Sequence, residues 1–183
     1  NGKQIAFTVL NRLYTLDLPT GKPTRVTNFN FTEAQPAWSP DGSLLVWVSW
    51  EGTEGHVYKL NLKLKGAKPV RLTNEGALYT EPVWAPQGNK IVLMRGTAND
   101  FREDPDPVTF ANQTEIVSLS GDGGAITSIA KAKGRSTPHF TRAGDRIYLY
   151  SGSKGLVSIR WDGTDEKAHL KVTGIMTYGS VAE

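Results

Sequence analysis

The sequence has 183 residues, enough for one domain with a sizeable core, and no run of apolar residues in it is long enough to span a membrane. It has no cysteine, which excludes disulfides, thiolate chemistry and cysteine-ligated metals. The net charge is only +3, and the lysines and arginines are scattered among acidic residues, which favours solubility over nucleic-acid binding as the reason for the basic excess.

Short β-strands separated by turns are predicted from the first residues onward. Residues 1–29 contain three strands of a unit whose first strand is missing. Because the sequence starts at Asn1 inside this unit, we expect it to be a fragment or mature piece of a larger protein. Residues 30–75 form a full unit, with β-rich runs at residues 44–49, 56–62 and 70–73.

A tight turn joins the first two strands of that unit. In Ser39-Pro40-Asp41-Gly42 the proline presets φ, the aspartate tolerates the second central position, and the glycine suits a position that needs positive φ. The surrounding motif recurs along the chain, as Pro36-Ala37-Trp38-Ser39-Pro40-Asp41-Gly42, Pro82-Val83-Trp84-Ala85-Pro86-Gln87-Gly88 and, more loosely, Pro138-His139-Phe140-Thr141-Arg142-Ala143-Gly144. A period of roughly 40–50 residues with about four strands per unit is typical of a β-propeller blade.

Two further units complete the predicted all-β propeller. Residues 76–130 form a blade with an insertion at residues 97–113, which is polar and acidic and is predicted to be a loop. Residues 131–174 form the last full blade, and residues 175–183 start or close another, giving about four blades of four antiparallel strands. The sequence allows two ways of closing the propeller: a four-bladed ring completed by residues 175–183, or self-association of two arcs through their exposed flanks. No segment of about 12 residues carries a helical apolar pattern.

The repeated residues also carry a family resemblance. The motif Pro-x-Trp-Ser-Pro-Asp-Gly, followed by a β-rich run, Val57-Tyr58-Lys59-Leu60 and Arg71-Leu72-Thr73, resembles the WD-like propeller repeat of the TolB type. That repeat is shared with tricorn protease and prolyl-peptidase-like enzymes. Residues 156–174 also resemble propeller segments that precede amidohydrolase domains in some bacterial proteins. The resemblance implies a propeller and a periplasmic or extracellular location. The later copies depart from it at Gln87 and at Arg142-Ala143, so those turns are expected to be built differently.

Aromatic residues recur at matching positions of the units. They are Trp38, Trp84 and Phe140 on the first strands, Trp47 and Tyr148 on the second, and Tyr14 and Tyr58 on the third. Their recurrence in register favours packing between blades over an exposed surface that binds sugars, which is the alternative.

The candidate binding residues precede or lie within the first strand of each blade. By blade geometry, Glu33, Glu81 and Arg135 gather at one mouth of the central channel, where loops of several blades converge to bind a peptide or a small cation. His139 occupies a position that is apolar in the other copies, so it is either a channel-facing ligand group or a core histidine with satisfied hydrogen bonds. Ordinary strand-start loops are the alternative for the first three.

No catalytic motif accompanies this set. The sequence has no zinc-site histidine spacing, phosphate-binding loop or nucleophile elbow, so we predict no catalytic residue, no metal and no cofactor. The acidic residues Asp100, Glu103, Asp104 and Asp106 do not follow a calcium-loop order and are read as a solvated loop.

The sequence therefore predicts a non-catalytic binding or scaffold module. Its partner is a protein, a peptide or a missing domain of the same parent chain, with no nucleic acid and no membrane span. The alternative is the propeller domain of a larger hydrolase, an amidohydrolase or a prolyl-type peptidase, whose catalytic residues lie outside this chain. A carbohydrate-binding propeller would need exposed aromatic side chains.

Overall fold

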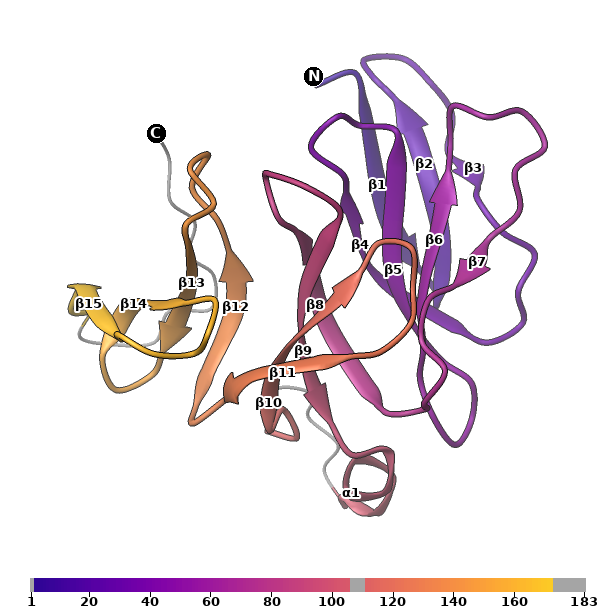
Figure 1. Cartoon of the computed structure of the whole chain (residues 1–183). Helices are drawn as coiled ribbons and strands as arrows, with labels where there is room; N and C mark the ends of the chain where they lie inside the picture. The colour runs from indigo at the N-terminus through magenta and orange to yellow at the C-terminus, as the bar shows by residue number, and fades with distance from the viewer. Residues whose placement is uncertain (1, 106–110, 173–183) are drawn as a thin grey trace.

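The computed structural model describes residues 2–105 and 111–172, which form fifteen β-strands and one short helix (Figure 1). Strands that are neighbours in sequence pair in antiparallel fashion and make four sheets. The sheets contain β1 (Gln4–Val9), β2 (Arg12–Asp17) and β3 (Thr24–Arg25); β4 (Thr32–Trp38), β5 (Leu44–Trp50), β6 (Val57–Asn61) and β7 (Val70–Arg71); β8 (Leu78–Trp84), β9 (Lys90–Gly96), β10 (Glu115–Ser120) and β11 (Thr127–Lys131); and β12 (Arg135–His139), β13 (Arg146–Ser151), β14 (Gly155–Arg160) and β15 (Lys167–Leu170).

Each sheet is one blade of a propeller, and the blades follow one another from β1–β3 at one side to β12–β15 at the other (Figure 1). We call them the first to the fourth blade. The first blade has three described strands and the others have four, as the sequence predicted. The all-β propeller prediction is therefore confirmed, and β4, β8 and β12 are the first, innermost strands of the three four-stranded blades.

The three clusters of buried residues lie between successive blades, so the second and third blades bury both faces, and the first and fourth each pack one face against a described neighbour. In the first of the three clusters, between the first two blades, the fully buried ring of Trp47 stacks on Tyr58 with centroids 5.8 Å apart. Trp84 is 5% exposed and belongs to the cluster between the second and third blades. Of the recurrent aromatic residues, Trp47, Tyr58 and Trp84 are thus buried as expected, whereas Trp38 and Phe140 are half-buried at cluster edges.

The turn of the second blade is built as its sequence indicates. Gly42 has φ of 66°, and Ser39 Oγ donates to Asp41 Oδ1 at 2.6 Å and accepts from the backbone N–H of Leu44 at 2.9 Å. The Ser39 and Ser43 hydroxyls hold the pKa of Asp41 well below its usual range. The turn thus fixes the register of β4 against β5.

The insertion at residues 97–113 differs from the loop that the sequence predicted, because it contains helix α1 (Ala98–Glu103). Thr97 caps this helix by accepting the backbone N–H of Asp100 on its Oγ1 at 3.0 Å. Phe101 packs edge-on against Trp50, with ring centroids 4.9 Å apart. A tertiary contact and a cap therefore stabilise a helix too short to show a periodic pattern.

The outer strands of the third and fourth blades are β11 and β15. In both blades the pairing register shifts at a bulge, between Ile116 and Val117 and between Leu156 and Val157. Bulges insert a residue that strand propensity alone does not reveal.

The expected closure by residues 175–183 lies outside the described residues, as does Asp106. Within residues 2–105 and 111–172 there is no helix with the length and apolar character needed to cross a membrane.

Candidate binding site at the channel mouth

A bulge recurs on the inner strand of each four-stranded blade. The pairing of β4, β8 and β12 with the next strand is interrupted at equivalent places, and the residues there are Gln35, Glu81 and Thr137. Their φ values are 52°, 55° and 52°. A non-glycine residue in this left-handed region costs about 1–3 kcal/mol, so the surrounding contacts must hold it there.

Hydrogen bonds between blades provide those contacts. The backbone N–H of Glu81 donates to Gln35 Oε1 at 2.7 Å, and the backbone N–H of Thr137 donates to Glu81 Oε2 at 2.6 Å. The side chains of Gln35 and Glu81 thus each accept a backbone N–H from the bulge of the following blade. We call these three residues the inner ladder, and it couples the inner strands of the second, third and fourth blades.

Glu33 does not lie at the position equivalent to Glu81. Counted from the shared proline, Glu81 matches Gln35, whereas Glu33 matches Tyr79 and Arg135. Glu33 is 1% exposed, and the Thr27 hydroxyl donates its one proton to the carboxylate, with its Oγ1 2.8 Å from Oε1 and 2.7 Å from Oε2. Burial raises the pKa of its carboxyl, although the Thr27 and Leu13 donors oppose the shift. In the described residues this carboxylate binds groups of its own chain.

Arg135 is also buried and has internal partners. Its Nη1 donates to Glu166 Oε2 at 2.9 Å, and its Nε donates to the carbonyl of Ala132 at 3.0 Å. Lys154, as the first cause, and Arg135 hold the pKa of Glu166 below its usual range. The arginine thus connects β12 to the segment that leads into β15.

His139 lies on the face of the fourth blade that points away from the third. Its Nδ1 is 2.8 Å from the carbonyl of Thr137, and its ring lies 5.9 Å from that of Tyr148. Nε2 is buried and has no hydrogen-bond partner among residues 2–105 and 111–172. Thus Glu33 and Arg135 are in internal bonds, Glu81 is in the inner ladder, and His139 stands apart; as ligand-binding groups all four stay predictions.

A cavity opens beside the inner ladder, at the end of the blades where the inner strands β4 and β8 start. We define the mouth end as the end of the blades that carries residues 51–56, residues 74–77 and α1; these segments lie together at the bottom of Figure 1. The cavity has a volume of about 280 Å³ and lies between the second and third blades. Its lining residues are Thr32, Ala34, Gln35, Val48, Ser49, Trp50, Leu78, Tyr79, Thr80 and Phe101.

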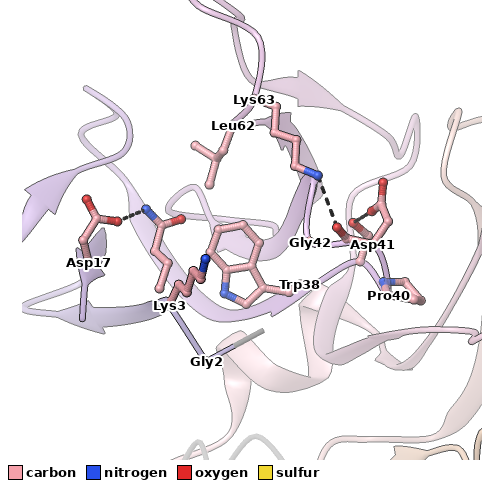
Figure 2. A pocket seen from close by; sticks show the side chains of 11 residues that line it. Gly2, Lys3, Asp17, Trp38, Pro40, Asp41, Gly42, Leu62 and Lys63 are labelled. Carbon is pink, nitrogen blue, oxygen red and sulfur yellow. Dashed lines mark hydrogen bonds between the residues drawn. The ribbon is translucent and has the colours of Figure 1, made fainter. Parts of the chain in front are cut away.

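A second cavity, of about 410 Å³, lies at the opposite end, between the first and second blades (Figure 2). It is bordered by the Trp38 indole, with Lys3 and Asp17 on one side and Lys63 and Asp41 on the other. The carboxylates of Asp17 and Asp41 have protein partners, since Gln4 Nε2 donates to Asp17 at 2.7 Å and Ser43 Oγ donates to Asp41 at 2.6 Å. This site carries charges of both signs and favours neither cations nor anions.

Within the described residues, no three His, Cys, Asp or Glu side chains are grouped so that they could hold a metal ion. Ser158 and His169 are the nearest approach to a serine–histidine pair, at 2.7 Å. Ser158 is fully buried and its Oγ also accepts Arg146 Nε at 2.7 Å, so it is not accessible to a substrate.

Gln35 and Phe101, which shape the mouth cavity, are not among the residues that the sequence predicted for the site. Gln35 could have been found by aligning the repeats on their prolines. Phe101 carries no such signal, because it lies in an insertion and its role depends on contact with Trp50.

Comparison with known proteins matches the chain to propellers. A family model described as "TolB beta propeller domain" matches residues 1–106. A Tol-Pal system protein TolB from Francisella tularensis subsp. mediasiatica is 28% identical over 195 aligned positions, which cover 87% of this chain and 45% of that protein. The chain thus spans less than half the length of the curated relatives it matches.

Solved structures show the same fold. TolB from Acinetobacter baumannii has a TM-score of 0.63 at 20% identity, covering 88% of this chain and 39% of that one. An oligogalacturonate lyase in complex with manganese has a TM-score of 0.64 at 16% identity, covering 87% of this chain and 46% of the lyase. Propellers of this fold therefore occur both in TolB and in an enzyme, and the likeness to these structures defines the fold alone.

Proposed function

Because this chain belongs to the TolB beta-propeller domain family, we propose that it is a non-catalytic binding module that holds a protein or peptide partner at its mouth end. The observation that carries the proposal is the mouth cavity, which opens between two inner strands where several loops meet. The relatives are named for the Tol-Pal system, which is consistent with work alongside other proteins and agrees with the periplasmic location implied by the resemblance.

In this proposal the four predicted residues have different roles, from contact with the partner to support of the mouth. Glu81 lies in the inner ladder next to Gln35, which lines the cavity, so a partner lying over the ladder would reach its carboxylate. Glu33 and Arg135 support the mouth from within, because both are buried in bonds to neighbouring segments. His139 is available to a group that covers the outward face of the fourth blade. That group is another part of the parent protein or a second copy of the chain.

Selection of peptides provides the test. A random peptide library displayed on phage is panned on the immobilised chain, and each selected peptide is then added for amide hydrogen exchange. We expect protection at residues 49–56, 74–81 and α1, and none at the turns of the opposite end. A failure to select any peptide, or protection only at the opposite end, would overturn the proposal.

The alternative is that the chain is the propeller of a larger hydrolase whose catalytic residues lie elsewhere. The likeness to an oligogalacturonate lyase favours it only to the extent that enzymes use this fold. The full-length parent protein decides this point. Hydrolysis of peptide or cyclic-amide substrates by the parent, lost on changing residues outside this chain, would support the alternative, and the lack of any such activity would exclude it.

A further inference from the structure

The mouth cavity differs from the other cavity described above in its chemistry. Its walls are formed by side chains of β4, β5 and β8, including Val48, Leu78 and Tyr79, which are almost fully buried. Phe101 of α1 and Trp50 of β5 meet edge-on at its border, with centroids 4.9 Å apart. The insertion that carries α1 thus adds an aromatic wall to the cavity.

Three polar groups of the lining already have partners within the chain. Ser49 Oγ donates to Glu51 Oε1 at 2.8 Å, and Thr80 Oγ1 accepts Gln113 Nε2 at 2.8 Å. Gln35 Oε1 accepts the backbone N–H of Glu81 at 2.7 Å. A ligand group that bonded to one of these three would have to displace an existing hydrogen bond, and the buried apolar walls of the cavity favour an apolar group.

The border of the cavity is acidic. Five carboxylates lie on the loops and the helix around it, and the exposed ones can attract a cation from solvent; they are Glu51, Glu54, Glu75, Asp100 and Glu103. Two arginines lie nearby. Arg95 pairs with Glu115 at 2.6 Å, whereas Arg102 donates to the neutral side-chain amide of Asn99 at 2.6 Å and keeps its charge, so the five carboxylates outnumber the positive charge at the opening. The field at the opening therefore favours a positively charged partner.

The pKa of the Tyr79 hydroxyl, at the cavity wall, depends on burial and on the charges around the cavity. The hydroxyl donates to the carbonyl of Glu75 at 2.9 Å. Burial, as the first cause, raises its pKa to about 12, with Arg95 opposing and the charges of Glu75 and Glu54 adding to the rise. Two of the border carboxylates, Glu75 and Glu54, thus act on this wall of the cavity, against the opposing charge of Arg95.

We propose that the mouth cavity receives one aromatic side chain of a basic partner segment, with lysines or arginines beside it meeting the acidic border. The proposal rests on the proposed function and names the chemistry of its partner. A volume of about 280 Å³ suits one large side chain rather than a whole small-molecule ligand. Trp50 and Phe101 offer ring edges and faces for it to contact.

Defined peptides test the chemistry. The probe is fluorescein-labelled Gly-Lys-Trp-Lys-Gly, with Gly-Lys-Ala-Lys-Gly and Gly-Glu-Trp-Glu-Gly as matched controls, titrated into the full chain and followed by fluorescence anisotropy. We expect each control to bind at least about tenfold more weakly, and the difference between the lysine and glutamate peptides to shrink as salt is added. Equal binding of the tryptophan and alanine peptides would overturn the aromatic assignment.

Variants of the protein test whether the peptide binds in the mouth cavity. Phe101→Ala removes the aromatic wall, and Ala34→Leu fills the cavity from the inner strand without depending on α1. Both should weaken the tryptophan peptide about tenfold. Glu75→Gln combined with Asp100→Asn should weaken only the lysine-containing peptides. The matched controls are Leu64→Ala, whose side chain is 62% exposed on the β6–β7 connection, and Asp145→Asn at the β12–β13 turn; neither should change binding.

The two proposals fail in different ways. If library-selected peptides protect the mouth end but the tryptophan peptide binds no better than its controls, the proposed function stands and the basic aromatic partner is wrong. If Phe101→Ala and Ala34→Leu, both shown to be folded by circular dichroism, leave the affinity unchanged, the cavity is not the binding site.

Discussion

Replacing Trp84 by alanine tests whether the blades are held together by the repeated aromatic residues. Trp84 is 5% exposed and packs in one cluster with Tyr79, Ile91 and Leu119. An aromatic side chain buries about 150–250 Å². At about 25 cal/mol per Å² this corresponds to about 4–6 kcal/mol of transfer free energy, an upper value because the unfolded chain already buries part of its surface.

Two further effects change that value. The indole Nε1 of Trp84 is buried and has no hydrogen-bond partner in the described part of the chain, so the variant also removes an unsatisfied donor that costs about 1–3 kcal/mol. Against this, alanine leaves a cavity where the ring lay close to Gly121, and such a cavity adds to the loss. The expected net loss in the free energy of unfolding is about 3–5 kcal/mol.

Urea denaturation followed by far-ultraviolet circular dichroism measures this loss, since the signal does not depend on the tryptophan removed. Leu64→Ala, at a side chain that is 62% exposed, is the matched control and should change stability by less than about 0.5 kcal/mol. A loss below about 1 kcal/mol for Trp84→Ala would refute the reasoning that this ring is a core contact between blades.

Three other predictions follow from the described contacts. Because the pKa of Glu33 is raised in the folded state, its ionisation destabilises the fold as pH rises through the ordinary glutamate range. In urea melts, the stability of Glu33→Gln relative to the unsubstituted protein should therefore increase between about pH 4 and pH 7. A stability difference between the two proteins that is the same at both pH values would contradict this. Glu81→Ala removes the acceptor of the Thr137 N–H and should lose about 1–3 kcal/mol in the same melts, whereas Glu81→Gln, which keeps an acceptor, should lose less; equal losses would show that the inner ladder is unimportant. Thr97→Ala removes the cap of α1 and should cost the helix about 0.5–2 kcal/mol, seen as faster amide hydrogen exchange in residues 98–103 with an unchanged exchange rate in β9.

The repeated motif determined the blades because its signals are local. The Ser39-Pro40-Asp41-Gly42 turn and the branched, aromatic run after it are favoured by the sterics of those residues themselves. Since the motif recurs, its aromatic residues were predicted to pack between blades. The burial of Trp47, Tyr58 and Trp84 confirms this for three of the seven, whereas Tyr14, Trp38, Phe140 and Tyr148 are half-buried. Fold class, strand order and part of the core were therefore readable from the sequence.

The tertiary structure alone decided the details of the site. The nearness of Glu33 and Arg135 to strand starts suggested that they face the channel. In the structure the Glu33 carboxylate accepts from Thr27 in the preceding blade, and the Arg135 guanidinium donates to Glu166, 31 residues further along the chain. The inner ladder depends on bulges, and α1 depends on a contact between Phe101 and Trp50. Bulges, buried charges and short helices are fixed by contacts between residues far apart in the chain, and such contacts leave no periodic trace in the sequence.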